Sequence, residues 1–397
     1  MNQRQLFLQH VAQTSSAPLA IAIKKAKGCY FWDRKGKKYL DLISGIAVSS
    51  IGHGNRRVVK AVQKQASRYM HTMVYGEHIQ EPQGLLAQKI CELLPDNLNN
   101  VYFVNSGSEA IEGAMKLAKR VTGRNGFVAQ ELSYHGSTHG AMSLMSDVFF
   151  TEKYLPLLPS ITFIKANDLA SIDKINESIA GVIVEFVQAE RGVFALKEEF
   201  IVALSKRCKE VGALLIADEI QTGMGRTGTL FAFQQYGIVP DILVLAKSFG
   251  AGMPLGCFIA NKSLMDTLQE NPPLGHITTF GGHPVSCAAA YAGLVELNSK
   301  NWVDEVNRKG NLFVAKLKHP LIKEIRQQGL MIAVDFGNSA LNHAVIDACL
   351  ENGLHVDWFL FNEQSMRICP PLIITDEEIK WACKIILTIL NKQNATQ

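Results

Sequence analysis

Two short apolar runs, each ending in a charged residue, limit most strongly how this chain can fold. The run LLIA closes in Asp218, and the run ILVLA closes in Lys247. A loop and a short helix are expected between them, so both runs are predicted to be strands of one sheet. Open α/β sheets bind their ligands outside the carboxyl ends of their strands. We therefore expect Asp218 and Lys247 to share one site.

The segment before this pair favours a doubly covered parallel sheet. Residues 161–218 alternate between runs rich in Ile and Val and patterns typical of helices, expected at 169–178 and 198–211. With 397 residues the chain has room for two domains. We predict an amino-terminal arm (1–50), with a hairpin around 33–37, that joins a carboxyl-terminal part (286–397) in a smaller α+β domain. Residues 51–285 would form the large domain.

Composition excludes several classes of partner. A net charge of +4 is small for this length and argues against a nucleic-acid surface. No apolar run approaches the roughly 18 residues of a membrane span. The 8 cysteines show no paired spacing that would indicate zinc or a disulfide framework, so no metal is expected. A reducing, cytoplasmic location is the expectation.

An aspartate and a lysine at one sheet edge suit pyridoxal 5'-phosphate as cofactor. The lysine amine forms a Schiff base with the cofactor aldehyde, and the carboxylate keeps the pyridine nitrogen protonated. Taken alone, such a pair is more often two solvated strand ends. The surrounding segments ADEIQTGMGRTG and LAKSFGAGMPLG, however, resemble the two signature segments of the class III, or ω-type, aminotransferases. These include enzymes for acetylornithine, ornithine and diaminobutyrate.

The resemblance extends over about residues 28–390 through six ordered motifs. It implies a fold-type I enzyme, whose large domain has a mostly parallel seven-stranded sheet covered by helices. It also implies ping-pong transamination, in which Lys247 binds the cofactor and then moves the proton as a free base, while Asp218 anchors the ring nitrogen. Gln221 is expected at the phenolic oxygen of the ring.

Further motifs supply the remaining cofactor contacts. The segment NSGSEA opens a predicted helix, whose free N–H groups suit a phosphate, although a plain serine cap would read the same way. Its resemblance to the family's phosphate loop favours the first interpretation. The family stacks an aromatic residue on the cofactor in a motif that YHG matches, and its threonine in TTFGG contacts the phosphate of the neighbouring subunit. The resemblance thus implies a homodimer with shared active sites, and the residues carried over are Ser106, Gly107, Ser108, Tyr134, His135 and Thr279.

Three residues concern the substrate. Arg367 in MRICPPL matches the family arginine that binds the α-carboxylate of glutamate or 2-oxoglutarate, and Glu190 matches the acid that pairs with it. As a bare residue, Glu190 beside Arg191 would more simply be a surface ion pair. Ser137 stands where relatives specific for ornithine or acetylornithine carry a carboxylate-binding arginine, and a hydroxyl cannot replace that clamp. The resemblance implies a small-molecule terminal-amine donor and a 2-oxo acid acceptor, 2-oxoglutarate before pyruvate.

Two alternatives remain at this point. Aminomutases and racemases of the same family share the cofactor motifs. The segment GMGRTG also fits G-x-G-x-x-G literally, as in a nicotinamide-dependent oxidoreductase, but the nearest acid, Asp241, comes too early for a dinucleotide site. We expect its three glycines to be turn residues with positive φ.

Overall fold

The large part of the molecule is built on one seven-stranded sheet. The computed structural model describes residues 2–74 and 76–394. In this sheet β12 runs antiparallel to both of its neighbours, and the other paired strands run parallel. The predicted mostly parallel sheet is confirmed. In spatial order its strands are β4 (Asn100–Val104), β12 (Gly256–Ala260), β11 (Ile242–Leu245), β10 (Leu214–Asp218), β7 (Ile179–Val184), β5 (Gly126–Gln130) and β6 (Ile161–Ile164).

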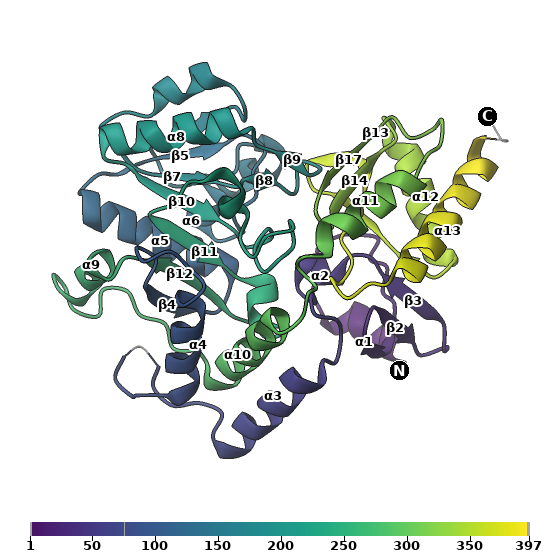
Figure 1. Ribbon diagram of the computed structural model, residues 1–397, viewed down its shortest axis with the longest axis horizontal. Helices are drawn as coiled ribbons and strands as arrows, with labels where there is room; N and C mark the ends of the chain where they lie inside the picture. Colours follow the sequence, from purple (N-terminus) through teal and green to yellow (C-terminus); the bar gives the residue numbers. More distant parts are fainter. Residues whose placement is uncertain (1, 75, 395–397) are drawn as a thin grey trace.

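Helices cover both faces of the sheet, as Figure 1 shows. Because successive side chains of a strand point to opposite faces, Leu215 packs in one apolar cluster and Ile216 in another. The cluster of Leu215 includes helix α8 (Glu198–Val211), and that of Ile216 includes helix α5 (Gly107–Thr122). Both strand faces are therefore buried, which explains why these strands read as continuous apolar runs.

The two ends of the chain meet in a smaller lobe, at the right of Figure 1. The short strand β15 pairs in parallel with β3, which joins the carboxyl-terminal region to the amino-terminal hairpin. The predicted smaller α+β part from both termini is thus confirmed. Its two sheets contain β1 (Ile23–Lys27), β2 (Tyr30–Asp33), β3 (Lys38–Asp41) and β15 (Leu354–His355), and β13 (Glu324–Gln328), β14 (Met331–Asp335), β17 (Asn362–Ile368) and β16 (Asp357–Phe359).

Long helices complete both parts. Helix α10 packs against α3 and α4, beside the large sheet. The predicted domain boundary after residue 285 falls after the second residue of this helix. Helices α11 and α12 pack against α13 in the smaller lobe. These helices are α3 (Arg56–Arg68), α4 (Glu81–Cys91), α10 (Pro284–Asn298), α11 (Val306–Lys316), α12 (Ser339–Glu351) and α13 (Asp376–Asn394).

One predicted helix is wrong in type and length. The segment expected to be helical over 169–178 forms only a 3-10 helix, η2 (Leu169–Lys174). The hydroxyl of Ser171 donates to backbone carbonyls, and the carboxylate of Asp168 accepts from the N–H of Ala170. Such local bonds compete with the α-helical pattern. By contrast, the helix predicted over 198–211 is confirmed at both ends as α8.

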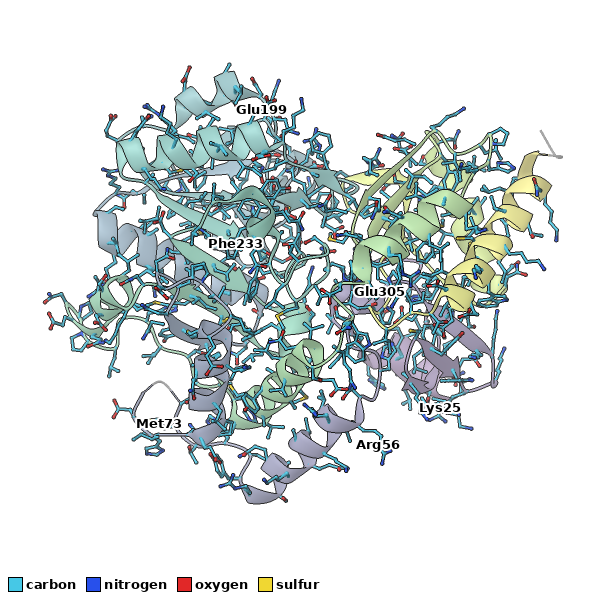
Figure 2. All side chains as sticks on the ribbon, in the orientation of Figure 1. Lys25, Arg56, Met73, Glu199, Phe233 and Glu305 are labelled. Carbon is cyan, nitrogen blue, oxygen red and sulfur yellow. The ribbon has the colours of Figure 1, made fainter. Side chains whose placement is uncertain are left out.

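The remaining elements are short, and they are named at the end of this paragraph. Among all helices in the described part of the chain, none is long and apolar enough to cross a membrane. Figure 2 shows Phe233 inside the large part, while the exposed side chains of Lys25, Arg56 and Glu199 point outward. The short elements are α1 (Gln3–His10), α2 (Ser44–Ala47), α6 (His139–Met142), α7 (Val148–Thr151), α9 (Lys262–Met265), η1 (Glu152–Tyr154), η3 (Ala232–Tyr236), η4 (Lys247–Gly250), η5 (Asp266–Gln269), β8 (Val187–Gln188) and β9 (Phe194–Ala195).

Candidate active site

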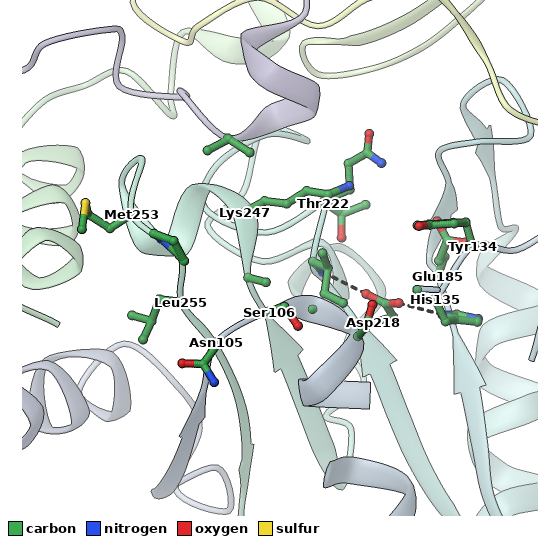
Figure 3. A pocket seen from close by; sticks show the side chains of 18 of the residues that line it. Asn105, Ser106, Tyr134, His135, Glu185, Asp218, Thr222, Lys247, Met253 and Leu255 are labelled. Carbon is green, nitrogen blue, oxygen red and sulfur yellow. Dashed lines mark hydrogen bonds and ion pairs between the residues drawn. The ribbon is translucent and has the colours of Figure 1, made fainter. Parts of the chain in front are cut away.

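The carboxyl ends of the parallel strands surround one cavity of about 360 Å³. Strand β10 ends at Asp218, and β11 leads through Ala246 to Lys247. Strands β4, β5 and β7 bring further segments to the same edge (Figure 3). The structure therefore places most of the predicted cofactor residues around a single cavity, namely Ser106, Gly107, Ser108, Tyr134, His135, Asp218, Gln221 and Lys247.

Lys247 is held in a strained, half-buried position. It begins η4 with φ +48°, a region that non-glycine residues seldom adopt. Burial lowers the pKa of its amine, and the positive charge of Arg367 lowers it further, against the opposing effect of the Glu190 carboxylate. A lowered pKa increases the share of neutral amine, which is the nucleophilic form. Strain of this kind is typical of functional sites.

Asp218 faces the cavity with its carboxylate fixed. Its Oδ2 lies 2.6 Å from Nδ1 of His135, and its Oδ1 accepts the N–H of Ile220 at 3.0 Å (Figure 3). Burial alone would lower the pKa of His135, but the hydrogen bond and charge of Asp218 raise it overall. The second ring nitrogen of His135 has no hydrogen-bond partner among the described residues. The hydrogen bond from His135 thus fixes the orientation of the Asp218 carboxylate.

A second carboxylate lines the cavity beside this pair. Burial raises the pKa of Glu185 to about 7, although the charge of His135 opposes the shift. Its oxygens accept the N–H groups of Tyr134 at 3.0 Å and Ala189 at 3.1 Å. Glu185 is not among the residues predicted from the sequence. It ends an apolar run as Asp218 does, and the same rule would have found it.

The amino end of helix α5 offers an anion site. Ser106 caps the helix by accepting the N–H of Glu109 at 3.2 Å, and the first N–H groups of a helix have no partner within it. A Cβ on Gly107 would lie 2.8 Å from Ile220, so no side chain fits between the helix end and that residue. Helix amino ends favour phosphate. A phosphate cradle, a half-buried lysine and a fixed aspartate in one cavity together fit pyridoxal phosphate.

Glu190 and Arg367 form a buried ion pair behind the cavity wall. Oε2 of Glu190 lies 2.6 Å from Nη2 of Arg367, and its Oε1 accepts from Gln221 at 3.3 Å. Burial would raise the pKa of Glu190, but the charges of Arg367 and Lys247 lower it overall. The simpler interpretation, a surface pair of Glu190 with Arg191, is wrong because Arg191 donates to the side chain of Gln188.

Comparison with known proteins agrees with this geometry. The family model for aminotransferase class-III matches residues 11–390. The chain belongs to the class III aminotransferases. It is 38% identical over 380 residues to the acetylornithine aminotransferase of Archaeoglobus fulgidus, covering 96% of this chain and 98% of that protein. It is 37% identical over 382 residues to the putrescine aminotransferase of Pectobacterium atrosepticum, and this match covers 92% of this chain and 81% of that protein.

A solved structure extends the comparison to the whole fold. The ornithine aminotransferase of Toxoplasma gondii, whose active site holds pyridoxal phosphate at partial occupancy, superimposes with a TM-score of 0.91 at 31% identity. The match covers 99% of this chain and 95% of that one. This class III enzyme is therefore a transaminase of the ω type with the fold-type I architecture, and pyridoxal phosphate is its cofactor.

The glycine-rich segment of this aminotransferase is a packing loop. Gly225 and Gly228 have positive φ, as expected, whereas Gly223 does not, so the prediction for all three is wrong at that residue. The buried guanidinium of Arg226 donates to the hydroxyl of Ser50 at 2.8 Å and to a backbone carbonyl of the smaller lobe, that of Leu330. The segment joins the two parts of the molecule, and no helix starts on it to hold a dinucleotide.

Some predicted residues lie off the cavity wall. Ser137 is exposed, and its Oγ lies 2.9 Å from the hydroxyl of Tyr134. Thr279 is also exposed and does not line this cavity. Conversely, Val48 lines the cavity unpredicted. It follows α2, in which Ser44 to Ala47 all have positive φ. The spacing of hydrophobic residues in the sequence does not predict that conformation.

Proposed function

We propose that this transaminase moves a terminal amino group from a small donor to a 2-oxo acid, 2-oxoglutarate, in two successive half-reactions. The observation that carries the proposal is the cavity that Lys247 and Asp218 share with the amino end of α5. Bound pyridoxal phosphate supplies an aldehyde and an electron-withdrawing ring. The remaining work falls to side chains of the protein.

Each cavity residue has a separate task in the proposal. Lys247 would hold the cofactor and, as a free amine, would accept a proton from the donor carbon as a general base. Asp218, oriented by His135 at 2.6 Å, holds a negative charge toward the ring nitrogen. Ser106, Gly107 and Ser108 bind the phosphate at the start of α5. Tyr134 would stack on the ring, and Gln221 would contact its phenolic oxygen; both side chains line the cavity.

The buried ion pair is the proposed acceptor site. A carboxylate of the 2-oxo acid replaces Glu190 on Arg367, since both are carboxylates and the guanidinium fork suits either. This exchange requires Glu190 and Gln221, which separate Arg367 from the cavity, to move. A donor that reacts through a terminal amine has no carboxylate on the reacting carbon and leaves the Glu190–Arg367 pair closed. The two substrates can thus use one cavity in turn, which is the requirement of a ping-pong reaction.

The donor is a terminal amine whose far end meets no arginine clamp. Ser137 and the hydroxyl of Tyr134 form a neutral polar pair there, 2.9 Å apart. Relatives named for acetylornithine and for putrescine fit this description, since both compounds carry a primary amine at a chain end. Diaminobutyrate and ornithine belong to the same class.

We further propose a homodimer in a reducing, cytoplasmic setting. In the dimer the partner subunit's Thr279 would complete the phosphate site, and its exposure in a single chain supports this. The 8 cysteines are all free in the described chain, in keeping with a reducing compartment.

The test is a set of single half-reactions. Cofactor-loaded enzyme is mixed, without an acceptor, with putrescine, N-acetylornithine, ornithine, 2,4-diaminobutyrate or glutamate. We expect glutamate and one terminal amine to abolish the visible absorbance of the lysine-bound cofactor, and 2-oxoglutarate to restore it. If no donor changes the absorbance, transamination of these substrates is excluded. If a donor is isomerised without any oxo acid, the aminomutase interpretation replaces ours.

A further inference from the structure

Arg367 lies between two carboxylates, of which only Glu190 has a place in the proposed function. The second is Asp357, which sits opposite Arg367 where strands β16 and β17 pair. Its Oδ1 lies 3.2 Å from Nε of Arg367. The arginine side chain is 4% exposed and that of Asp357 is 27% exposed, so the pair lies largely outside bulk water. An ion pair so placed interacts more strongly than one on the surface.

The two carboxylates occupy different edges of the guanidinium group. Nη2 donates to Glu190 and, at 3.0 Å, to the carbonyl of Trp358, while Asp357 lies beside Nε. Neither Nη1 nor Nε has a hydrogen-bond partner among the described residues, so the contact of Nε with Asp357 is an ion pair without a hydrogen bond. The ring of Phe359 lies 4.6 Å from Cζ and fixes the plane of the group. A carboxylate that replaces Glu190 can therefore reach Nη1 and Nη2 while Asp357 stays in place.

We infer that Asp357 is a positioning residue that compensates part of the charge of Arg367 and thereby weakens its hold on substrate carboxylates. The inference rests on the proposed function, in which Arg367 receives the carboxylate of the 2-oxo acid. A second negative charge close to the incoming carboxylate opposes its binding by roughly three- to tenfold, allowing for partial solvent screening. The same effect speeds the release of glutamate, which leaves from this position.

The surroundings of Asp357 give its effect a dependence on pH. Burial raises the pKa of Asp357 to about 6, the charge of Arg367 opposes this, and Glu190, His355 and Asp41 are the other charged or titratable groups that act on it. Protonation removes its charge, so dicarboxylates should bind more tightly as the pH falls from 8 toward 6. Glu190 does not follow, because its pKa is lowered. His355 and Asp41 lie together at 3.4 Å and remain in any variant of Asp357.

The experiment measures binding of glutarate, a dicarboxylate without amine or oxo group, to the cofactor-loaded enzyme by calorimetry at pH 6, 7 and 8. We expect Asp357→Asn to lower the Kd at pH 8 by roughly three- to tenfold. The difference from the wild type should shrink toward pH 6. Glu363→Gln is the matched control, because it removes one negative charge from an exposed position on β17, the strand that carries Arg367, and we expect it to leave the Kd unchanged.

The possible outcomes distinguish a failure of this inference from a failure of the proposed function on which it rests. If Arg367→Ala leaves the Kd for glutarate unchanged, the proposed acceptor site fails and the inference fails with it. If Arg367→Ala weakens glutarate binding, but Asp357→Asn binds glutarate no more tightly than the wild type does, only the role of Asp357 is overturned. Should Asp357→Asn not fold, the wild type still decides, because a Kd that does not fall between pH 8 and pH 6 contradicts the inference.

Discussion

A methyl group added at Gly136 would collide with the first turn of helix α5 and so disturb the phosphate cradle. Gly136 has φ +134°, and an ideal Cβ there would lie 2.9 Å from Cα and 2.8 Å from Cβ of Ser108, in the first turn of α5. Carbon atoms normally approach to about 3.5–4.0 Å, so Ser108 must shift by roughly 1 Å. The unfavourable φ costs about 1–3 kcal/mol, and overpacking costs about 1–3 kcal/mol more.

We therefore expect Gly136→Ala to lose about 2–6 kcal/mol of unfolding free energy and to bind pyridoxal phosphate at least about tenfold more weakly. Urea denaturation of the apoenzyme and fluorescence titration with the cofactor measure the two effects. Gly84→Ala is the control, since Gly84 lies exposed in helix α4 with no atom near its Cβ position. It should gain up to about 1 kcal/mol and keep its cofactor affinity. Wild-type stability and affinity in Gly136→Ala would refute the reasoning.

Three further substitutions test the site. Asp218→Asn removes the charge behind the cofactor ring, so kcat should fall by about 100-fold or more while the cofactor stays bound; unchanged steady-state kinetics would exclude that role. Glu190→Gln leaves Arg367 with a poorer partner and should cost about 3 kcal/mol of stability. In thermal melts glutarate should partly restore this stability; a melting temperature of the variant that glutarate does not raise would count against the acceptor site. Burial raises the pKa of Glu219 to about 7, so the folded protein holds this proton more tightly than the unfolded chain. Its contribution to stability is greatest below pH 4.5 and falls by about 3 kcal/mol up to pH 7. Glu219→Gln should lack this fall in urea denaturation at pH 5 and pH 8, and an identical pH slope would contradict it.

The sheet and the cofactor cavity could be predicted because the information is local. Asp218 and Lys247 each end an apolar run, and parallel strands bring their carboxyl ends to one edge. The phosphate site likewise depends on a short segment, since the small residues around Gly107 stand directly before a helical pattern. These features depend on residues that lie close together in the sequence, so the local sequence pattern was enough to predict them.

Contacts between distant segments could not be predicted in this way. The bond between His135 and Asp218 joins residues 83 positions apart, and Asp357 meets Arg367 only through the pairing of two strands in the smaller lobe. Side chains also overrode helical spacing around Ser171, where hydroxyl bonds favoured a 3-10 turn. Such outcomes depend on tertiary packing, which one sequence does not encode as a repeating pattern.

The central claim is that the amine of Lys247 binds the cofactor. Borohydride reduction of the cofactor-loaded enzyme, followed by tryptic digestion and mass spectrometry, identifies the lysine that becomes covalently labelled. Our account predicts one label, on the peptide from Thr227 to Lys262, because modification of Lys247 blocks cleavage there. A label on another lysine, with Lys247 unmodified, would contradict the account.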